Sequence, residues 1–157
     1  MTILAKVKIC SSFLLIILVA GMLCACGSPA PEVPPTSDTS STAADKVEVI
    51  YFHRPRRCVT CLCFEERIRH VVKTYFQDEM NSGKLTFEVI DIGDERNTAI
   101  VNKYGAISSQ LFINSVKDGV DHIRDIQEIW SWDCRSDAEG FEQKVKNTIE
   151  LSLKYEE

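Results

Sequence analysis

Two cysteines two residues apart form the part of the sequence best suited to chemistry. Cys58 and Cys61 follow the apolar, β-rich run 47–53 and stand at the start of a long helical pattern. A cysteine at a helix N-terminus meets unpaired backbone N–H groups and the positive end of the helix dipole, which favour its thiolate. A second thiol one turn later can attack a mixed disulfide and release the partner. The spacing therefore predicts thiol–disulfide exchange, with Cys58 as the nucleophile and Cys61 as the resolving thiol.

The N-terminal segment predicts where this chemistry takes place. Two lysines precede an apolar run, 13–20, that is short for a membrane span and typical of an export signal. A leucine three residues before Cys26 and an alanine directly before it resemble a bacterial lipobox. We therefore expect residues 1–25 to be a lipoprotein signal peptide. A lipid on Cys26 would anchor the chain on the extracytoplasmic face of a cell membrane; the alternative is an uncleaved N-terminal anchor helix.

Export changes the interpretation of the seven cysteines in the chain. Three of them belong to the signal peptide or to the lipid attachment site, which leaves Cys58, Cys61, Cys63 and Cys134. In a reducing cytosol such a group would first suggest a metal site, whereas outside the cytoplasm disulfides are the default. We therefore expect disulfide chemistry among these four residues.

Composition divides the exported part into a tether and one domain. Four of the five prolines lie in residues 26–45, among serines and threonines and almost nothing that could be buried. Such a segment cannot offset its ordering entropy, so we expect a disordered tether after the lipidated cysteine. Residues 46–157 have the length of one domain. A net charge of −5, from 23 acidic and 18 basic residues, gives no support for a nucleic-acid partner.

The hydrophobic periodicity of residues 46–157 switches several times between the strand and helix patterns. Gly105 ends one helical segment, and residues 117–119 have the composition of a hairpin turn. We expect strands at 47–53, 85–92, 109–114 and 120–123, and helices at 58–80, 94–104 and 136–153. The predicted order is β-α-β-α-β-β-α, an α/β domain with right-handed crossovers between its parallel strands.

This order and the residues around the cysteines resemble the thioredoxin-like superfamily in its minimal form. The pattern Tyr51-Phe52-His53, four further residues and then Cys58-x-x-Cys61 is similar, more narrowly, to the small ArsF-type proteins, known as nitrophenyl compound nitroreductase subunits. The resemblance implies a thiol-disulfide oxidoreductase acting on envelope proteins, or a non-catalytic partner subunit. No G-x-G-x-x-G or P-loop pattern for a flavin or nicotinamide cofactor is present, so no such cofactor is expected.

Two positions depart from the family pattern. Thioredoxins usually carry a tryptophan before the first cysteine, where this chain has Arg57, and a cis-proline opposite the cysteines, where this chain has Ser109. In the family that proline helps hold a partner's backbone and keeps metal off the thiols. The resemblance therefore implies that His53, Arg57 and Ser109 are accessory residues facing the partner, and that exchange is slow and restricted to few partners.

The same cysteines allow a metal-binding interpretation. His53, Cys58, Cys61 and Cys63 form the pattern H-x(4)-C-x(2)-C-x-C, and thiolates with an imidazole suit copper(I) or zinc. A membrane-tethered copper or zinc carrier is therefore the alternative function. Because Cys63 lies five residues after Cys58 on the expected helix, it points toward a different face, and we predict a buried free thiol there. Pairing of Cys63 with Cys134 stays open, since connectivity cannot be read from spacing.

Overall fold

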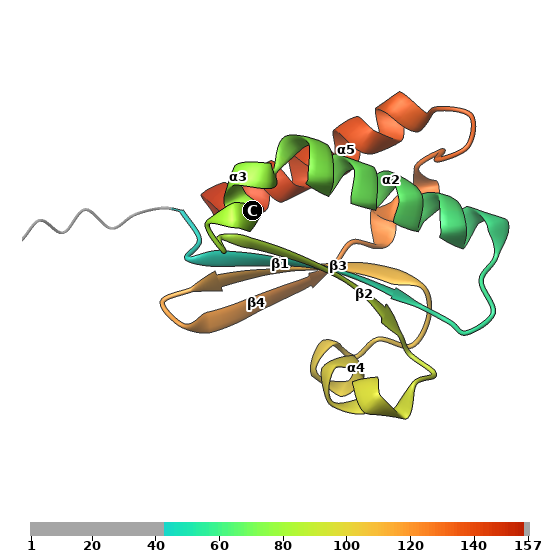
Figure 1. Ribbon diagram of the computed structural model, residues 1–157, viewed down its shortest axis with the longest axis horizontal. Helices are drawn as coiled ribbons and strands as arrows, with labels where there is room; N and C mark the ends of the chain where they lie inside the picture. The colour runs from blue at the N-terminus through green and yellow to red at the C-terminus, as the bar shows by residue number, and fades with distance from the viewer. Residues whose placement is uncertain (1–42, 156–157) are drawn as a thin grey trace, which may run out of the picture. The chain divides into compact units, whose positions relative to one another are not determined.

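Strand β1 (Lys46–His53) lies inside a mixed sheet in the computed structural model, which describes residues 43–155 (Figure 1). The sheet has the order β2-β1-β3-β4. Strand β2 (Leu85–Asp91) pairs parallel to β1, and β3 (Gln110–Lys117) pairs antiparallel to it on the other side. Strand β4 (Val120–Asp125) pairs antiparallel to β3. The predicted signal peptide, Cys26 and most of the predicted tether lie outside the described residues.

Helices cover both faces of this sheet. Figure 1 shows α2 and α5 over one face and α4 on the opposite face. The helical elements are α2 (Val59–Tyr75), α3 (Gln77–Asn81), the 3-10 turn η1 (Glu95–Asn97), α4 (Thr98–Tyr104), the 3-10 turn η2 (Gln127–Ser131) and α5 (Ala138–Lys154). The predicted order β-α-β-α-β-β-α and the α/β class of a minimal thioredoxin-like fold are thus confirmed.

Strand β1 is apolar throughout its centre because helices pack on both of its sides. Val49 and Tyr51 point into the main core with α2 and α5, whereas Ile50 and Phe52 belong to a second apolar cluster with Tyr104 of α4. Successive side chains of a strand face opposite sides of the sheet, so this alternation follows directly from the pleat. The loop that carries Cys58 therefore follows a strand whose centre is buried on both faces.

Left-handed residues close two of the connections. Gly105 has a φ of 66° and ends α4, and Asp118 and Gly119, with φ of 51° and 75°, form the turn between β3 and β4. Positive φ at both central residues is what a tight hairpin turn requires. The predicted hairpin at residues 117–119 and the helix end at Gly105 are thus confirmed.

The predicted helix 58–80 is in fact two helices. Helix α2 ends at Tyr75, and Phe76, with φ −125° and ψ 31°, breaks the helical geometry before α3 begins. Phe76 is only 3% exposed, so the break turns its ring into the core. Its backbone N–H still donates to the Val72 carbonyl at 3.1 Å, which completes the last turn of α2. The apolar periodicity continues across the break, and this is why the sequence pattern predicted a single helix.

The packed part of the chain begins just before β1. Ala44 is 2% exposed, and its N–H donates to the Leu153 carbonyl at 3.1 Å. The N–H of Asp45 donates to the Val116 carbonyl at 2.8 Å. These bonds connect the start of the domain to α5 and β3. Within residues 43–155, no helix combines the length and the apolar character that crossing a bilayer requires.

Candidate redox site

Cys58 is the N-cap of α2, directly before the 17-residue helix. Its sulfur accepts a hydrogen bond from the backbone N–H of Cys61 at 3.0 Å, and its carbonyl accepts from the N–H of Leu62 at 3.0 Å. The first turn of α2 contains no acidic residue. The positive end of the helix dipole is therefore not offset by a carboxylate of that turn, and it favours negative charge on the Cys58 sulfur.

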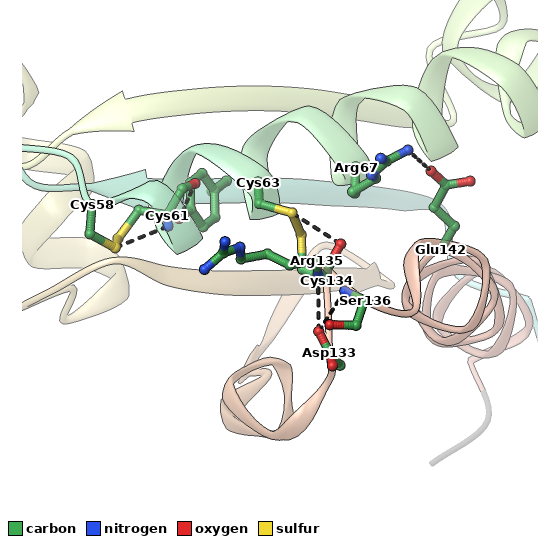
Figure 2. Close-up of a disulfide and its surroundings, with 10 residues drawn as sticks. Cys58, Cys61, Cys63, Arg67, Asp133, Cys134, Arg135, Ser136 and Glu142 are labelled. Atoms are coloured by element: carbon green, nitrogen blue, oxygen red, sulfur yellow. Dashed lines mark hydrogen bonds and ion pairs between the residues drawn. A yellow bond between two sulfur atoms is a disulfide. The ribbon is translucent and has the colours of Figure 1, made fainter.

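The two cysteines of the motif differ in exposure. They form a disulfide with a Cα–Cα distance of 5.0 Å, and Figure 2 shows it at the start of α2. Cys58 is exposed, whereas Cys61 is only 6% exposed. A bulky partner can therefore reach the Cys58 sulfur, while the Cys61 sulfur is accessible chiefly from Cys58. This asymmetry matches the predicted roles of nucleophile and resolving thiol.

Tyr51 and Ser109 lie beneath the second cysteine. The Tyr51 hydroxyl donates to the Cys61 carbonyl at 3.0 Å. Burial raises the pKa of Tyr51 to about 12, and a hydrogen bond with the Ser109 side chain and the charge of Arg57 offset part of that rise. Tyr51 therefore stays a neutral donor at physiological pH. Ser109, 6% exposed, contacts the site from beneath rather than presenting its side chain to solvent.

Arg57 is held against α2 by an ion pair that the sequence analysis did not identify. Its guanidinium pairs with the carboxylate of Glu65, which also pairs with Arg69 at 2.8 Å. Burial alone would raise the pKa of Glu65, but the hydrogen bonds and charges of Arg69 and Arg57 outweigh it and lower that pKa. The charge of Arg57 beside Cys58 is thus partly neutralised. The sequence carried no clear signal for this pair, because Arg57 precedes the helix and lies eight residues from Glu65, outside the three- and four-residue spacing of helical side-chain pairs.

Cys63 is not the free thiol that we predicted. It forms a disulfide with Cys134, with a Cα–Cα distance of 6.2 Å (Figure 2). The predicted orientation was correct, because Cys63 does point away from the Cys58–Cys61 pair. The face it points to is covered by the loop after η2, and Cys134 of that loop, 2% exposed, meets it there. The pairing that spacing left open is therefore present in the structure.

The loop that carries Cys134 is ordered by the residue before it. Asp133 accepts hydrogen bonds from the backbone N–H groups of Arg135 at 3.1 Å and Ser136 at 2.9 Å (Figure 2). These bonds lower the pKa of Asp133. In the same loop, the ring of Trp132 packs edge-on against Phe141 of α5. The Cys63–Cys134 disulfide thus joins α2 to a turn that is already fixed on the core.

The metal-binding interpretation loses one of its ligands in this arrangement. Cys63 is bonded to Cys134, and the Nδ1 atom of His53 lies 3.0 Å from the carbonyl oxygen of Arg54. Among residues 43–155, no group of three or more His, Cys, Asp or Glu side chains is arranged to hold a metal ion. The structure therefore does not bring His53, Cys58, Cys61 and Cys63 together as a ligand set.

Neither a protein-family model nor a curated protein sequence matches this chain. The structure is similar to that of Malassezia sympodialis thioredoxin (Mala s 13), with 21% identity, a TM-score of 0.38 and coverage of 54% of this chain and 67% of that one. For zinc-bound human ERp44 the identity is 13% and the TM-score is 0.48. That match covers 75% of this chain and 29% of ERp44, less than a third of that protein. For a thioredoxin-like protein from Clostridium perfringens the identity is 13% and the TM-score is 0.37, with coverage of 59% of this chain and 78% of that one. At these values the fold assignment rests on the element and sheet order described above.

Proposed function

We propose that this protein exchanges thiols and disulfides with protein partners through Cys58 and Cys61. The observation that carries the proposal is the exposed Cys58 at the N-cap of α2, bonded to the buried Cys61. The helix N-terminus favours the thiolate of the cysteine that partners can reach. The proposed activity is that of a thiol-disulfide oxidoreductase that needs no metal, flavin or nicotinamide.

In the reducing direction, the Cys58 thiolate attacks one sulfur of a partner disulfide. The partner's S–S bond breaks, one partner sulfur leaves as a thiolate, and a mixed disulfide with Cys58 forms. Cys61 then loses its proton to solvent and attacks the Cys58 sulfur, which releases the second partner thiolate. The partner gains two electrons and the Cys58–Cys61 disulfide closes. In the oxidising direction, a partner thiolate attacks the Cys58 sulfur of that disulfide and the same steps run in reverse.

The Cys63–Cys134 disulfide supports the assignment of Cys58 and Cys61 as the exchanging pair. A bridge over the four residues from Cys58 to Cys61 closes a small loop and stabilises the fold by only about 2 kcal/mol, whereas one across a sequence separation of 71 contributes about 4 kcal/mol. Opening the first pair therefore costs the domain little. Cys63 and Cys134 serve as the structural pair, and the domain keeps its shape while Cys58 and Cys61 change oxidation state.

The proposal places this domain outside the cytoplasm. The lipobox before Cys26 and the proline-rich segment after it support a membrane-anchored lipoprotein whose domain reaches partners in the cell envelope. Two disulfides in one small domain are also typical of an oxidising compartment. Within the thioredoxin-like proteins, the pattern from Tyr51 to Cys61 supports a place among the small ArsF-type proteins.

Trapping of mixed disulfides tests the proposed roles. The Cys61→Ser variant of the full chain should accumulate mixed disulfides with envelope proteins on non-reducing gels, because nothing resolves the bond on Cys58. The Cys58→Ser variant should trap none. A Cys63→Ser, Cys134→Ser double variant, assayed under conditions where circular dichroism shows that it is folded, is the control and should trap no more than the wild type does. Equal trapping by the Cys58 and Cys61 variants, or trapping by neither, would overturn the proposed function.

A further inference from the structure

A groove of about 640 Å³ opens beside the redox site. Its lining comes from the loop before Cys58, from the segment directly after β2 and from the segment before β3. Six residues form it: Arg54, Pro55, Arg56, Ile92, Gly93 and Ile107. One side of the groove thus ends two residues before Cys58. The other ends two residues before Ser109, whose side chain bonds the Tyr51 hydroxyl beneath Cys61.

Close packing fixes the floor of this groove. A Cβ atom added to Gly93 would lie 2.4 Å from the Cγ atom of Pro55, so only glycine allows the two loops to approach this closely. The N–H of Gly93 donates to a carboxylate oxygen of Asp91 at 2.8 Å, and the N–H of Ile92 donates to the His53 carbonyl at 2.9 Å. The groove is therefore a preformed feature of the described domain.

The groove carries positive charge in a chain that is acidic overall. Arg54 and Arg56 are exposed, and in the part of the chain that the structure describes neither side chain forms an ion pair. Of the nearby charged groups, Arg57 pairs with Glu65 and Arg96 with Asp94, and the Asp91 carboxylate accepts the hydrogen bond from the Gly93 N–H at 2.8 Å. Two guanidinium groups are therefore available to a ligand, in a protein with a net charge of −5.

The remaining wall of the groove is apolar and offers few backbone donors. Ile107 is 78% exposed, the highest value among the large apolar side chains of the described domain. The N–H groups of Ile107 and Ser108 both donate to the side-chain oxygen of Gln110, at 2.9 and 3.1 Å. Because these two donors are occupied, recognition on this wall depends on side-chain contacts rather than on hydrogen bonds from these N–H groups to a partner's backbone carbonyl oxygens.

We infer that the groove binds the polypeptide segment flanking the reactive cysteine of an exported partner, and that it selects segments with acidic residues and an apolar one. The carboxylates pair with Arg54 and Arg56, and the apolar side chain packs on Ile107 and Ile92. The inference rests on the proposed function, because it names the substrate class of the same redox site. Electrostatic complementarity of this kind mainly sets the association rate and the choice of partner.

The test uses the full chain in non-ionic detergent and two disulfide-linked peptides that differ only in carrying two Glu or two Gln beside the cysteine. The reduced protein should reduce the acidic peptide about three- to tenfold faster, the effect expected for two exposed ion pairs. The Arg54→Gln, Arg56→Gln double variant should lose this preference. Arg124→Gln, an exposed arginine on β4, is the matched control and should keep it. Raising the salt concentration should also reduce the preference.

Three outcomes would overturn the inference. These are equal rates for both peptides, an unchanged preference in the double arginine variant, or an arginine-dependent rate with glutathione disulfide but not with the acidic peptide. Binding of the same peptides with serine in place of cysteine, followed by fluorescence anisotropy, does not require exchange. If no peptide is reduced, the proposed function fails. The groove inference is then decided by the binding measurement alone: it stands if the acidic serine peptide binds more tightly than the neutral one, and it fails if the two bind equally.

Discussion

Glu65 holds the guanidinium of Arg57 against the side of α2, directly before the exposed cysteine of the site. The same carboxylate accepts a hydrogen bond from the guanidinium of Arg69 at 2.8 Å, so Glu65 forms ion pairs with two arginines. Both Arg57 and Glu65 act electrostatically on the buried Tyr51 hydroxyl, with opposite effects on its pKa. The ion pair between Arg57 and Glu65 therefore determines the net positive charge beside the N-terminus of α2.

Substitution of Glu65 and substitution of Arg57 should shift the pKa of the reduced Cys58 thiol in opposite directions. Glu65→Gln leaves the Arg57 charge unopposed and should lower the Cys58 thiol pKa, whereas Arg57→Gln should raise it. Each change should be less than about one unit, because solvent and salt screen an exposed site. The pH dependence of alkylation of the reduced protein measures this pKa. Glu150→Gln, which removes a carboxylate from α5, is the control; shifts of the same sign in both variants would argue against this role.

The two disulfides should differ in their contribution to stability. Cys63→Ser with Cys134→Ser should lower the free energy of unfolding by about 4 kcal/mol, because the bridge spans a long loop. Cys58→Ser with Cys61→Ser should lower it by no more than about 2 kcal/mol. Urea denaturation without a reductant measures both values. The opposite ranking would show that Cys58 and Cys61 form the structural pair, and would therefore also count against the proposed function.

The element order and the position of the motif could be predicted because they depend on local patterns. The β-rich run before Cys58, the left-handed Gly105 and the turn at residues 117–119 each carry their signal within a few residues. The N-cap position of Cys58 follows from the end of that run and the start of the helical period. The roles predicted for Cys58 and Cys61 thus depend on neighbours in the sequence, and the predicted element order is the one observed.

The features that the sequence did not reveal depend on contacts between distant segments. Cys63 meets Cys134 only because the loop after η2 folds over α2, at a sequence separation of 71. Tyr51 has the apolar pattern of a buried strand residue, and only the position of α2 above the sheet brings its hydroxyl to the Cys61 carbonyl. The groove likewise combines three connections whose proximity arises from the order of the strands.

Membrane anchoring is tested by a single substitution outside the described domain. Cys26→Ser removes the proposed lipid attachment site, so the protein should leave the membrane fraction, or its signal peptide should stay uncleaved and change its mobility on gels. Incorporation of a labelled fatty acid measures lipid attachment, membrane fractionation measures location, and gel mobility measures signal-peptide cleavage, each in comparison with the wild type. Cys24→Ser is the matched control and should keep both lipid and location. Lipid incorporation and membrane retention unchanged in Cys26→Ser would contradict anchoring through this residue.

Glu48 connects β1 to the elements on the α4 side of the sheet. Its carboxylate accepts hydrogen bonds from the Tyr104 hydroxyl at 2.8 Å and the Asn114 amide at 3.0 Å, and it pairs with Lys46 at 2.9 Å. Burial alone would raise the pKa of Glu48, but these three partners outweigh it and lower that pKa. Burial and the bond to Glu48 raise the pKa of Tyr104, which keeps it a donor.

This arrangement predicts a loss of stability in acid. Because the folded-state pKa of Glu48 lies below its ordinary value of 4.5, its contribution is complete above that pH and is lost as the pH falls through the folded-state value. Glu48→Gln should lower the free energy of unfolding by about 1–2 kcal/mol at pH 7, and the difference from the wild type should shrink below about pH 4. Urea denaturation between pH 3 and 7 measures it, with Glu88→Gln, at an exposed residue of β2, as the control. A difference that stays constant over this range would show that the Glu48 carboxylate does not stabilise the fold through its charge.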